Sequence, residues 1–282
     1  MNSFVVHRTL ASRVLARTRH AAPRHARALR TKFPTLGSVP LHSVARVTSL
    51  TAFVGLTAMV VTPREFPFKE SEEQSTNKDT QHKFPVTLRN NSESLTLIGS
   101  AVRAVTMFNF YTYTLGLYLA DSQLRALRAE YGAIASAENA ATALSTLSSA
   151  VTGASSPAGS VVALLRIVPY RRANPPHLLG SLSRATCQRV KEMHGDEQSR
   201  DWCAQLSASL PGVKDIEPGQ VIDIELLADG TARVYFKQQL TAELSRDSRA
   251  VSVLLQLFTG PKPRTAAVHQ ALVEGLRSAL AK

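Results

Sequence analysis

Arg103 is the charged residue whose surroundings in the sequence point most directly to chemistry. It lies in an apolar segment, Leu95–Val105, with the composition of a β-strand. Because side chains alternate along a strand, we expect Arg103 on the same face as Leu95, Leu97 and Ala101. A guanidinium on an apolar face is unfavourable unless an anionic or strongly polar group meets it. Arg103 therefore either anchors an anionic ligand in an apolar cleft, or pairs with a structural acid or reaches solvent at the strand end.

Other polar side chains near this position have weaker chemical implications. Tyr113 and Thr112 lie on the next predicted strand, where tyrosine more often packs than reacts. His177 follows two prolines at a predicted helix start, and a lone histidine there is more typical of a structural contact than of a ligand site. The sequence holds no glycine-rich nucleotide loop and no HExxH, CxxC or GxSxG motif, which disfavours metal, P-loop and serine hydrolase classes.

The elements that must position these residues alternate between strands and helices. The predicted strands are 95–105, 107–119, 160–168, 221–227, 231–238 and the start of another at 240–244. The predicted helices are 122–131, 177–193, 199–210, 248–258 and 265–280. Ala228-Asp229-Gly230 is typical of a hairpin turn. This order predicts an α+β fold with a largely antiparallel sheet. Residues 132–160 are rich in Ala, Ser and Thr and are interpreted as an insertion outside the core.

Positive charge is concentrated at the N-terminus. The formal net charge is +12, but residues 1–64 hold ten Lys or Arg and no acid, whereas the remainder holds 23 basic and 21 acidic residues. Since the remainder is almost neutral, no nucleic-acid partner is expected.

The N-terminal third has the composition of a targeting region. Residues 1–35, with recurrent arginine and no acid, are typical of a mitochondrial transit peptide. Residues 47–63 contain a sixteen-residue uncharged stretch that predicts a single transmembrane anchor. An extension of the targeting signal or a helix on the membrane surface are the alternatives. Residues 64–83 are interpreted as a polar linker to a domain at 84–282.

The predicted topology follows from this charge distribution. Basic residues before the anchor favour an N-terminus in the matrix, an anchor in the mitochondrial inner membrane and a domain in the intermembrane space. Cys187 and Cys203, sixteen residues apart, have no metal-site spacing. We expect two half-buried thiols, and a disulfide between them is conceivable if the domain faces the intermembrane space.

Four motifs carry a resemblance to a known family. They are Leu97–Arg103, Gly116–Leu119, Arg166–Pro169 and Phe258–Pro263. In order and spacing they resemble the chalcone isomerase family over about residues 84–282. The stretch from Arg166, with His177 following it, is similar to fungal mitochondrial members, the altered-inheritance-of-mitochondria group. The resemblance implies an open-faced β-sandwich in which a large antiparallel sheet is covered by helices, with a cleft between them.

In the family's isomerases, a phenolate attacks an enone, and an arginine with threonine, tyrosine and asparagine partners holds the developing charge. Arg103 matches the arginine. Tyr113, Pro175 and Leu182 stand where the threonine, tyrosine and asparagine are expected, and Ser252 is the counterpart proposed for a late polar residue. The retention of one residue of this set argues against flavonoid cyclisation.

Three functions are carried forward. Non-catalytic relatives hold an anionic apolar ligand, so we predict a binder of a fatty acid, or of haem, which is another candidate for the fungal branch. The predicted ligand-binding residues are Arg103, Tyr113, Thr112, His177 and Ser252. The first alternative is an intramolecular lyase in which Arg103 is catalytic. The second is a membrane-tethered scaffold without a small ligand.

Overall fold

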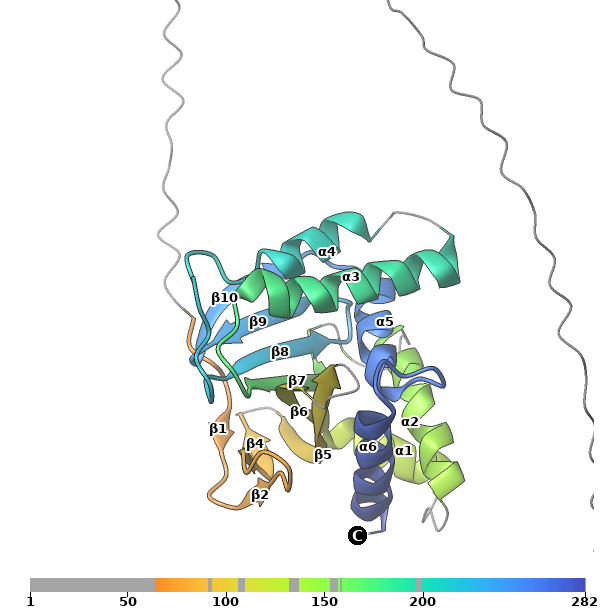
Figure 1. The fold of residues 1–282 in the computed structure, drawn as a ribbon. Helices are drawn as coiled ribbons and strands as arrows, with labels where there is room; N and C mark the ends of the chain where they lie inside the picture. Colours follow the sequence, from red (N-terminus) through yellow and green to blue (C-terminus); the bar gives the residue numbers. More distant parts are fainter. Residues whose placement is uncertain are drawn as a thin grey trace, which may run out of the picture. The chain divides into compact units, whose positions relative to one another are not determined.

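One curled antiparallel sheet organises the protein (Figure 1). A computed structural model describes residues 64–90, 93–105, 110–131, 137–152, 157, 159–195 and 199–281. Eight strands form this sheet in the order β1-β4-β5-β6-β7-β8-β9-β10, and every pairing is antiparallel. Its strands are β1 (Lys69–Glu70), β4 (Thr87–Arg89), β5 (Ser94–Val105), β6 (Phe110–Ala120), β7 (Val161–Pro169), β8 (Ile222–Leu227), β9 (Ala232–Phe236) and β10 (Gln239–Leu244). A separate hairpin joins β2 (Gln74–Thr76) to β3 (Lys83–Pro85).

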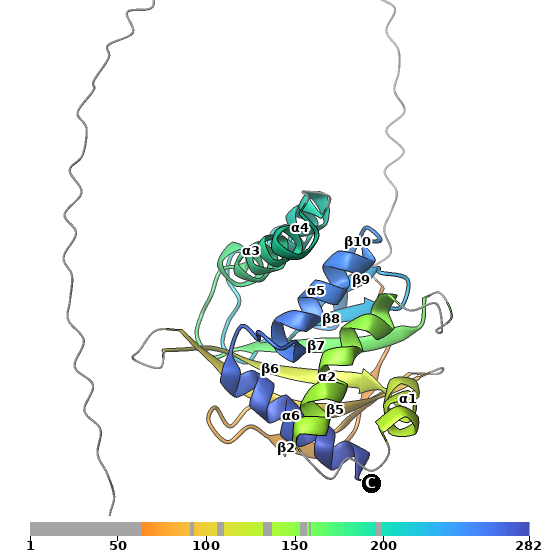
Figure 2. The same ribbon diagram turned by 90° about the vertical axis from the view of Figure 1, so that its right-hand side faces the viewer.

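Helices cover one face of this sheet. They are α1 (Asp121–Tyr131), α2 (Ala137–Thr152), α3 (Pro175–His194), α4 (Arg200–Ser207), α5 (Ser248–Thr259) and α6 (Ala266–Leu280). In Figure 2, α2, α5 and α6 lie in front of the sheet, and the α3–α4 pair lies beyond them at the top. The main core lies between sheet and helices, so the predicted α+β architecture, a large antiparallel sheet covered by helices, is confirmed.

Local sequence explains how the helices begin and how one of them meets the sheet. The side chain of Asn174 accepts a hydrogen bond from the backbone N–H of His177 and caps α3, whose first turn holds two prolines. Asp247 caps α5 in the same way. At Gly275 in α6, an added Cβ would overlap the carbonyl oxygen of Ile98 in β5. Glycine there allows α6 to press directly on β5, the strand that carries Arg103.

The interpretation of residues 64–83 as a polar linker is wrong. Glu65 bridges Gln239 at the β10 edge of the sheet, and β1 pairs with β4 at the other edge. Six residues can span at most about 20 Å, so the sheet curls until its two edges approach each other. Phe66 and Phe68 are buried in a second apolar cluster beneath this segment. Their alternation in the sequence was a strand signal that the polar neighbours obscured.

The interpretation of residues 132–160 as an insertion outside the core is also wrong. Helix α2 occupies much of this segment, and its buried residues are Ala140, Ala143, Leu144 and Leu147. Their spacing is that of one helix face. Small side chains suit this position because α2 packs against α5 and α6. The low aromatic content therefore reflects close helix packing and not exclusion from the core.

A β-bulge changes the face on which Arg103 lies. The pairing of β5 with β6 shifts between Leu97 and Gly99. As a result Leu95 and Leu97 pack with the second apolar cluster, while Ala101 and Arg103 lie on the helix-covered face. The expectation that Arg103 shares a face with Leu95 and Leu97 is wrong, because an irregularity of one residue reverses the alternation.

The predicted transit peptide at 1–35 and the predicted anchor at 47–63 lie outside the described residues. Within the described part of the chain, no helix has the length and apolar character needed to cross a membrane.

Candidate functional site

Arg103 and Tyr113 form a pair on the helix-covered face of the sheet. They lie opposite each other on β5 and β6. The Arg103 guanidinium lies 5.5 Å from the centre of the Tyr113 ring, and its Nη1 donates a hydrogen bond to the Tyr113 hydroxyl at 3.4 Å. Among the described residues, no carboxylate pairs with Arg103. The buried tyrosine thus orients a positive charge whose remaining donors can meet an anion.

The hydroxyl of Thr112 is engaged by the backbone. It donates to the carbonyl oxygen of Arg103 at 2.9 Å. This bond fixes the β5–β6 end at which the Arg103–Tyr113 pair lies. Thr112 therefore supports the pair through the backbone, and its hydrogen is not directed toward a ligand.

The structure does not bring His177 and Ser252 into the Arg103–Tyr113 group. His177 is exposed in the first turn of α3, where its backbone N–H is capped by Asn174. Ser252 is buried in α5, and its hydroxyl donates to the carbonyl oxygen of Ser148 in α2 at 2.9 Å. The Ser252 hydroxyl therefore serves helix packing. A ligand contact by His177 remains a prediction.

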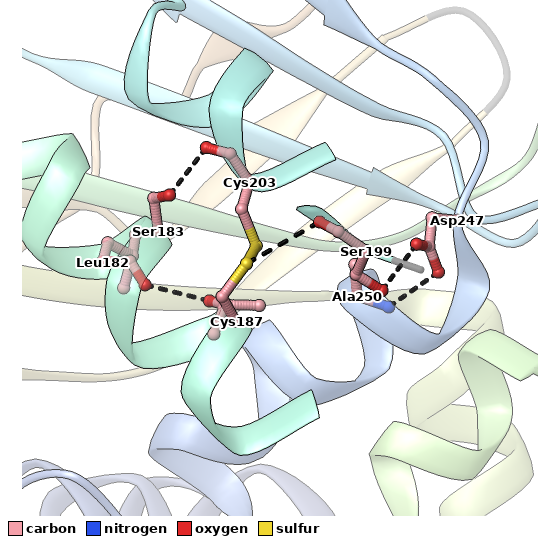
Figure 3. The surroundings of a disulfide bond; sticks show 8 residues. Leu182, Ser183, Cys187, Ser199, Cys203, Asp247 and Ala250 are labelled. Carbon is pink, nitrogen blue, oxygen red and sulfur yellow. Dashed lines mark hydrogen bonds between the residues drawn. A yellow bond between two sulfur atoms is a disulfide. The ribbon is translucent and has the colours of Figure 1, made fainter. Parts of the chain in front are cut away.

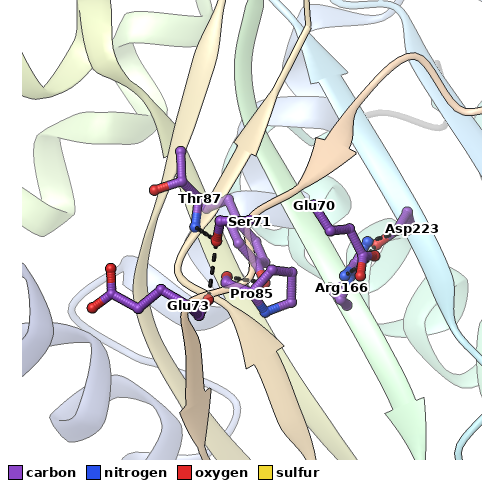
Figure 4. Close-up of polar contacts among 8 residues, drawn as sticks. Glu70, Ser71, Glu73, Pro85, Thr87, Arg166 and Asp223 are labelled. Atoms are coloured by element: carbon purple, nitrogen blue, oxygen red, sulfur yellow. Dashed lines mark hydrogen bonds and ion pairs between the residues drawn. The ribbon is translucent and has the colours of Figure 1, made fainter.

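Arg166 is a buried arginine on the opposite face of the sheet, and the sequence named it only as the start of a family motif, without a role. Arg166 in β7 donates through Nε and Nη2 to the two carboxylate oxygens of Asp223 in β8, at 2.8 and 3.0 Å. Its Nη1 donates to Glu70 in β1 at 2.7 Å (Figure 4). The rings of Phe66 and Tyr118 each lie 5.8 Å from the guanidinium. A charged residue within the apolar run Val161–Pro169 was the signal for this network.

The charges of this network stabilise one another against burial. Burial acts to lower the pKa of Arg166, but the charge and hydrogen bonds of Asp223 outweigh it, so the pKa of Arg166 is raised. Burial raises the pKa of Asp223, and Arg166 opposes that shift.

Beside the network, Ser71 accepts from the backbone N–H of Thr87 and donates to the Glu73 carbonyl, which fixes the turn after β1 (Figure 4).

A second polar cluster on this face holds the β2–β3 hairpin against the sheet. The fully buried Thr114 hydroxyl lies 2.8 Å from the Thr80 hydroxyl and 2.9 Å from Nδ1 of His82. Burial lowers the pKa of His82. This cluster docks the hairpin rather than forming a catalytic pair, because no acid orients the His82 ring among the described residues.

A disulfide joins Cys187 in α3 to Cys203 in α4 (Figure 3). Beside it, Ser183 donates to the carbonyl oxygen of Cys203 at 2.6 Å, and Ser199 donates to Asp247 at 2.7 Å. Asp247 also accepts from the backbone N–H of Ala250, so the α3–α4 pair is tied to the start of α5. The expectation of two half-buried free thiols is wrong, because antiparallel packing of the two helices brings the cysteines together.

No site for a metal ion is evident: the described residues contain no group of three or more His, Cys, Asp or Glu side chains placed to hold one.

Comparisons with known proteins agree with this architecture. No curated protein matches the sequence. A crystal structure of a fatty-acid binding protein from Arabidopsis thaliana is similar, with a TM-score of 0.59 and 15% sequence identity, over 74% of this chain and 99% of that chain. The family model described as "Chalcone isomerase like" matches residues 93–273. The chain therefore belongs to the chalcone isomerase-like family.

Proposed function

We propose that this protein is a non-catalytic binder of an anionic apolar ligand, held by Arg103 and Tyr113. One observation carries this proposal: Arg103 has its cation–π and hydrogen-bond partner in Tyr113 but no carboxylate among the described residues. A carboxylate accepting from Arg103 and from the Tyr113 hydroxyl would complete the pair. The ligand's apolar body would lie against the helix-covered face of the sheet.

A fatty acid suits this pair better than haem. Arg103 and Tyr113 can meet a carboxylate, which both ligands carry. Haem also needs an axial ligand such as histidine. The residues that interact with Arg103 and Tyr113 supply none, and His177 is not part of their group. The fold similarity to a plant fatty-acid binding protein is consistent with the same choice.

The alternative of an intramolecular lyase has less support. The Thr112 hydroxyl donates to a backbone carbonyl, so it is not available to stabilise an enolate. The positions expected to hold tyrosine and asparagine are occupied by Pro175 and Leu182, both buried. Arg103 and Tyr113 alone resemble a carboxylate-binding pair more closely than a complete catalytic set.

The binding test uses the purified full chain, freed of bound lipid and titrated with dodecanoate by calorimetry. We expect 1:1 binding that Arg103→Gln weakens by at least about tenfold, because a charge-assisted hydrogen bond contributes about 1.5–3 kcal/mol. Tyr113→Phe keeps the ring and removes the hydroxyl, so it should weaken binding by less. Arg125→Gln, at an exposed arginine on α1, is the matched control.

Two outcomes would contradict the proposal. One is the absence of dodecanoate binding by the wild-type chain. The other is binding that Arg103→Gln and Arg125→Gln weaken equally. Parallel titrations with haem, followed by absorbance, and with a chalcone, followed by loss of the enone band, test the other two ligand classes on the same protein.

We further propose that the domain faces the mitochondrial intermembrane space, anchored in the inner membrane through residues 47–63. The Cys187–Cys203 disulfide supports this placement, because disulfides persist in oxidising compartments. The basic N-terminus without acids supports import. Protease treatment of mitoplasts tests the side on which the domain lies, and resistance to carbonate extraction tests the anchor. Digestion once the outer membrane is ruptured is expected, whereas protection until detergent is added would place the domain in the matrix.

A further inference from the structure

Two more arginines lie near the Arg103–Tyr113 pair, on different elements. Arg264 precedes α6, and its Nη1 donates to the carbonyl oxygen of Ser181 in α3 at 3.1 Å. Arg184 is one turn further along α3, and its Nη1 would lie 3.4 Å from a Cβ added at Gly180. Both guanidiniums therefore flank the same turn of α3.

Arg264 lies within electrostatic range of both Arg103 and Arg184. Burial lowers the pKa of Arg264, and the positive charges of Arg103 and Arg184 lower it further, while Tyr113 acts in the opposite direction. Arg264, before α6, thus interacts with one like charge from β5 and one from α3. Like charges at close range destabilise one another unless an anion neutralises them.

No protein acid neutralises this group within the described ranges. Arg103, Arg184 and Arg264 form no ion pair there, whereas Arg166, Arg172, Arg233, Arg246 and Arg277 each do. The sequence outside these ranges contains two acids, Asp196 and Glu197, both beyond the end of α3 at His194.

We propose that Arg103, Arg184 and Arg264 together bind a dianionic head group, a phosphate monoester on an apolar tail. This deepens the proposed function, on which it rests. A carboxylate carries one charge, which Arg103 alone can meet. A phosphate monoester carries about −1.5 to −2 charges and three acceptor oxygens. Guanidinium groups match phosphate oxygens through paired N–H donors. The Tyr113 hydroxyl would add a neutral donor.

The test compares two ligands of equal chain length on the full chain. At about pH 8 a phosphate monoester is fully ionised, so dodecyl phosphate and dodecanoate differ mainly in head-group charge. We expect dodecyl phosphate to bind at least about tenfold more tightly, since one additional charge-assisted hydrogen bond supplies that factor. Arg184→Gln and Arg264→Gln should each reduce this preference while leaving dodecanoate binding nearly unchanged. Arg103→Gln should weaken both ligands, and Arg125→Gln neither.

Arg184 is exposed, so Arg184→Gln should fold. This variant therefore tests the inference even if Arg264→Gln, which removes the bond to Ser181, disturbs the segment before α6. Two results would overturn this inference but not the proposed function. The wild-type chain could bind dodecyl phosphate no more tightly than dodecanoate, or Arg184→Gln and Arg264→Gln could both keep the preference for dodecyl phosphate. Failure of both ligands to bind would overturn the proposed function with it. Titration with inorganic phosphate tests whether the ligand's apolar tail contributes to binding. If inorganic phosphate binds as tightly as dodecyl phosphate, the site is one for free phosphate and the proposed apolar tail is contradicted.

Discussion

Arg103 and Arg166 lie on opposite faces of one sheet, and their guanidinium groups have different partners in the protein. Arg166 has two carboxylate partners, Asp223 and Glu70, and two flanking aromatic rings. Arg103 has one tyrosine. In the first arrangement, groups of the protein itself pair with the Arg166 guanidinium. In the second, no carboxylate among the described residues meets the Arg103 guanidinium, which leaves donors for the proposed ligand.

The two faces also differ in what covers them. The face of Arg166 is closed by the chain itself, because residues 64–70 run from the β10 edge to the β4 edge over the second apolar cluster. The face of Arg103 is covered by helices drawn from distant parts of the sequence. A face closed by the chain itself favours a fixed internal ion pair, and Arg166 has one. The comparison therefore indicates a structural role for Arg166 and agrees with the binding role proposed for Arg103.

Removing each arginine in turn tests this assignment most severely. Arg166→Met should lower the free energy of unfolding by about 3–5 kcal/mol, because it leaves the Asp223 carboxylate buried without its partner. Arg103→Gln should lower it by less than about 1 kcal/mol, the scale of a cation–π contact. Urea unfolding followed by circular dichroism measures both.

A compensating variant separates the lost pair from a general packing defect. Arg166→Met combined with Asp223→Leu should recover much of the stability, since an apolar pair can replace a buried ion pair. Equal destabilisation by Arg103→Gln and Arg166→Met would refute the distinction between a structural and a binding arginine.

The disulfide gives the next largest expected effect and concerns the helix side. Cys187→Ser with Cys203→Ser should lower the free energy of unfolding by about 3 kcal/mol, because the bond closes a loop of roughly fifteen residues in the unfolded chain. Since α3 carries Arg184, loosening of the α3–α4 pair should also reduce the phosphate preference more than dodecanoate affinity. Thermal unfolding with and without reductant measures how much the disulfide contributes to stability. No shift in the wild-type midpoint on complete reduction would contradict a stabilising bond.

The fold was largely predictable because strand alternation, helix spacing and the turn at Ala228-Asp229-Gly230 are local signals. The cost of a charge on an apolar face drew attention to Arg103, but the face itself was assigned wrongly, and its ligand contact stays a prediction. The same reasoning applies to Arg166, but its partner Asp223 is 57 residues away, and a single sequence does not give strand register over that distance. The bulge at Leu97 reversed the face assignment for a similar reason: one extra residue leaves no clear mark in composition.

Convergence of Arg184 and Arg264 on Arg103 was also not predictable. The three belong to a helix, a loop and a strand, and their relation depends on the packing of α3 on α5, of α5 on α6 and of α6 on β5. In contrast, the roles of α2 and of residues 64–70 had sequence signals. Ala140, Ala143, Leu144 and Leu147 follow helical spacing, and Phe66 and Phe68 alternate like a strand.

The smallest expected effect is a pH dependence on the closed face. The pKa of His82 is lowered in the folded protein, so between its folded and unfolded values the unfolded chain binds more protons. Stability must therefore fall as pH drops below the ordinary histidine pKa of 6.5, and the loss levels off below the folded pKa. Protonation also alters the His82–Thr114 bond, so the loss should appear first in β2–β3.

Hydrogen exchange at about pH 7.5 and pH 5.5, corrected for intrinsic rates, should show faster opening of the hairpin in acid. His82→Gln keeps a side chain that can bond Thr114 but cannot titrate, and should remove the difference. If the variant retains the full pH dependence, the hairpin responds to another group, and His82 does not control the cover of this face.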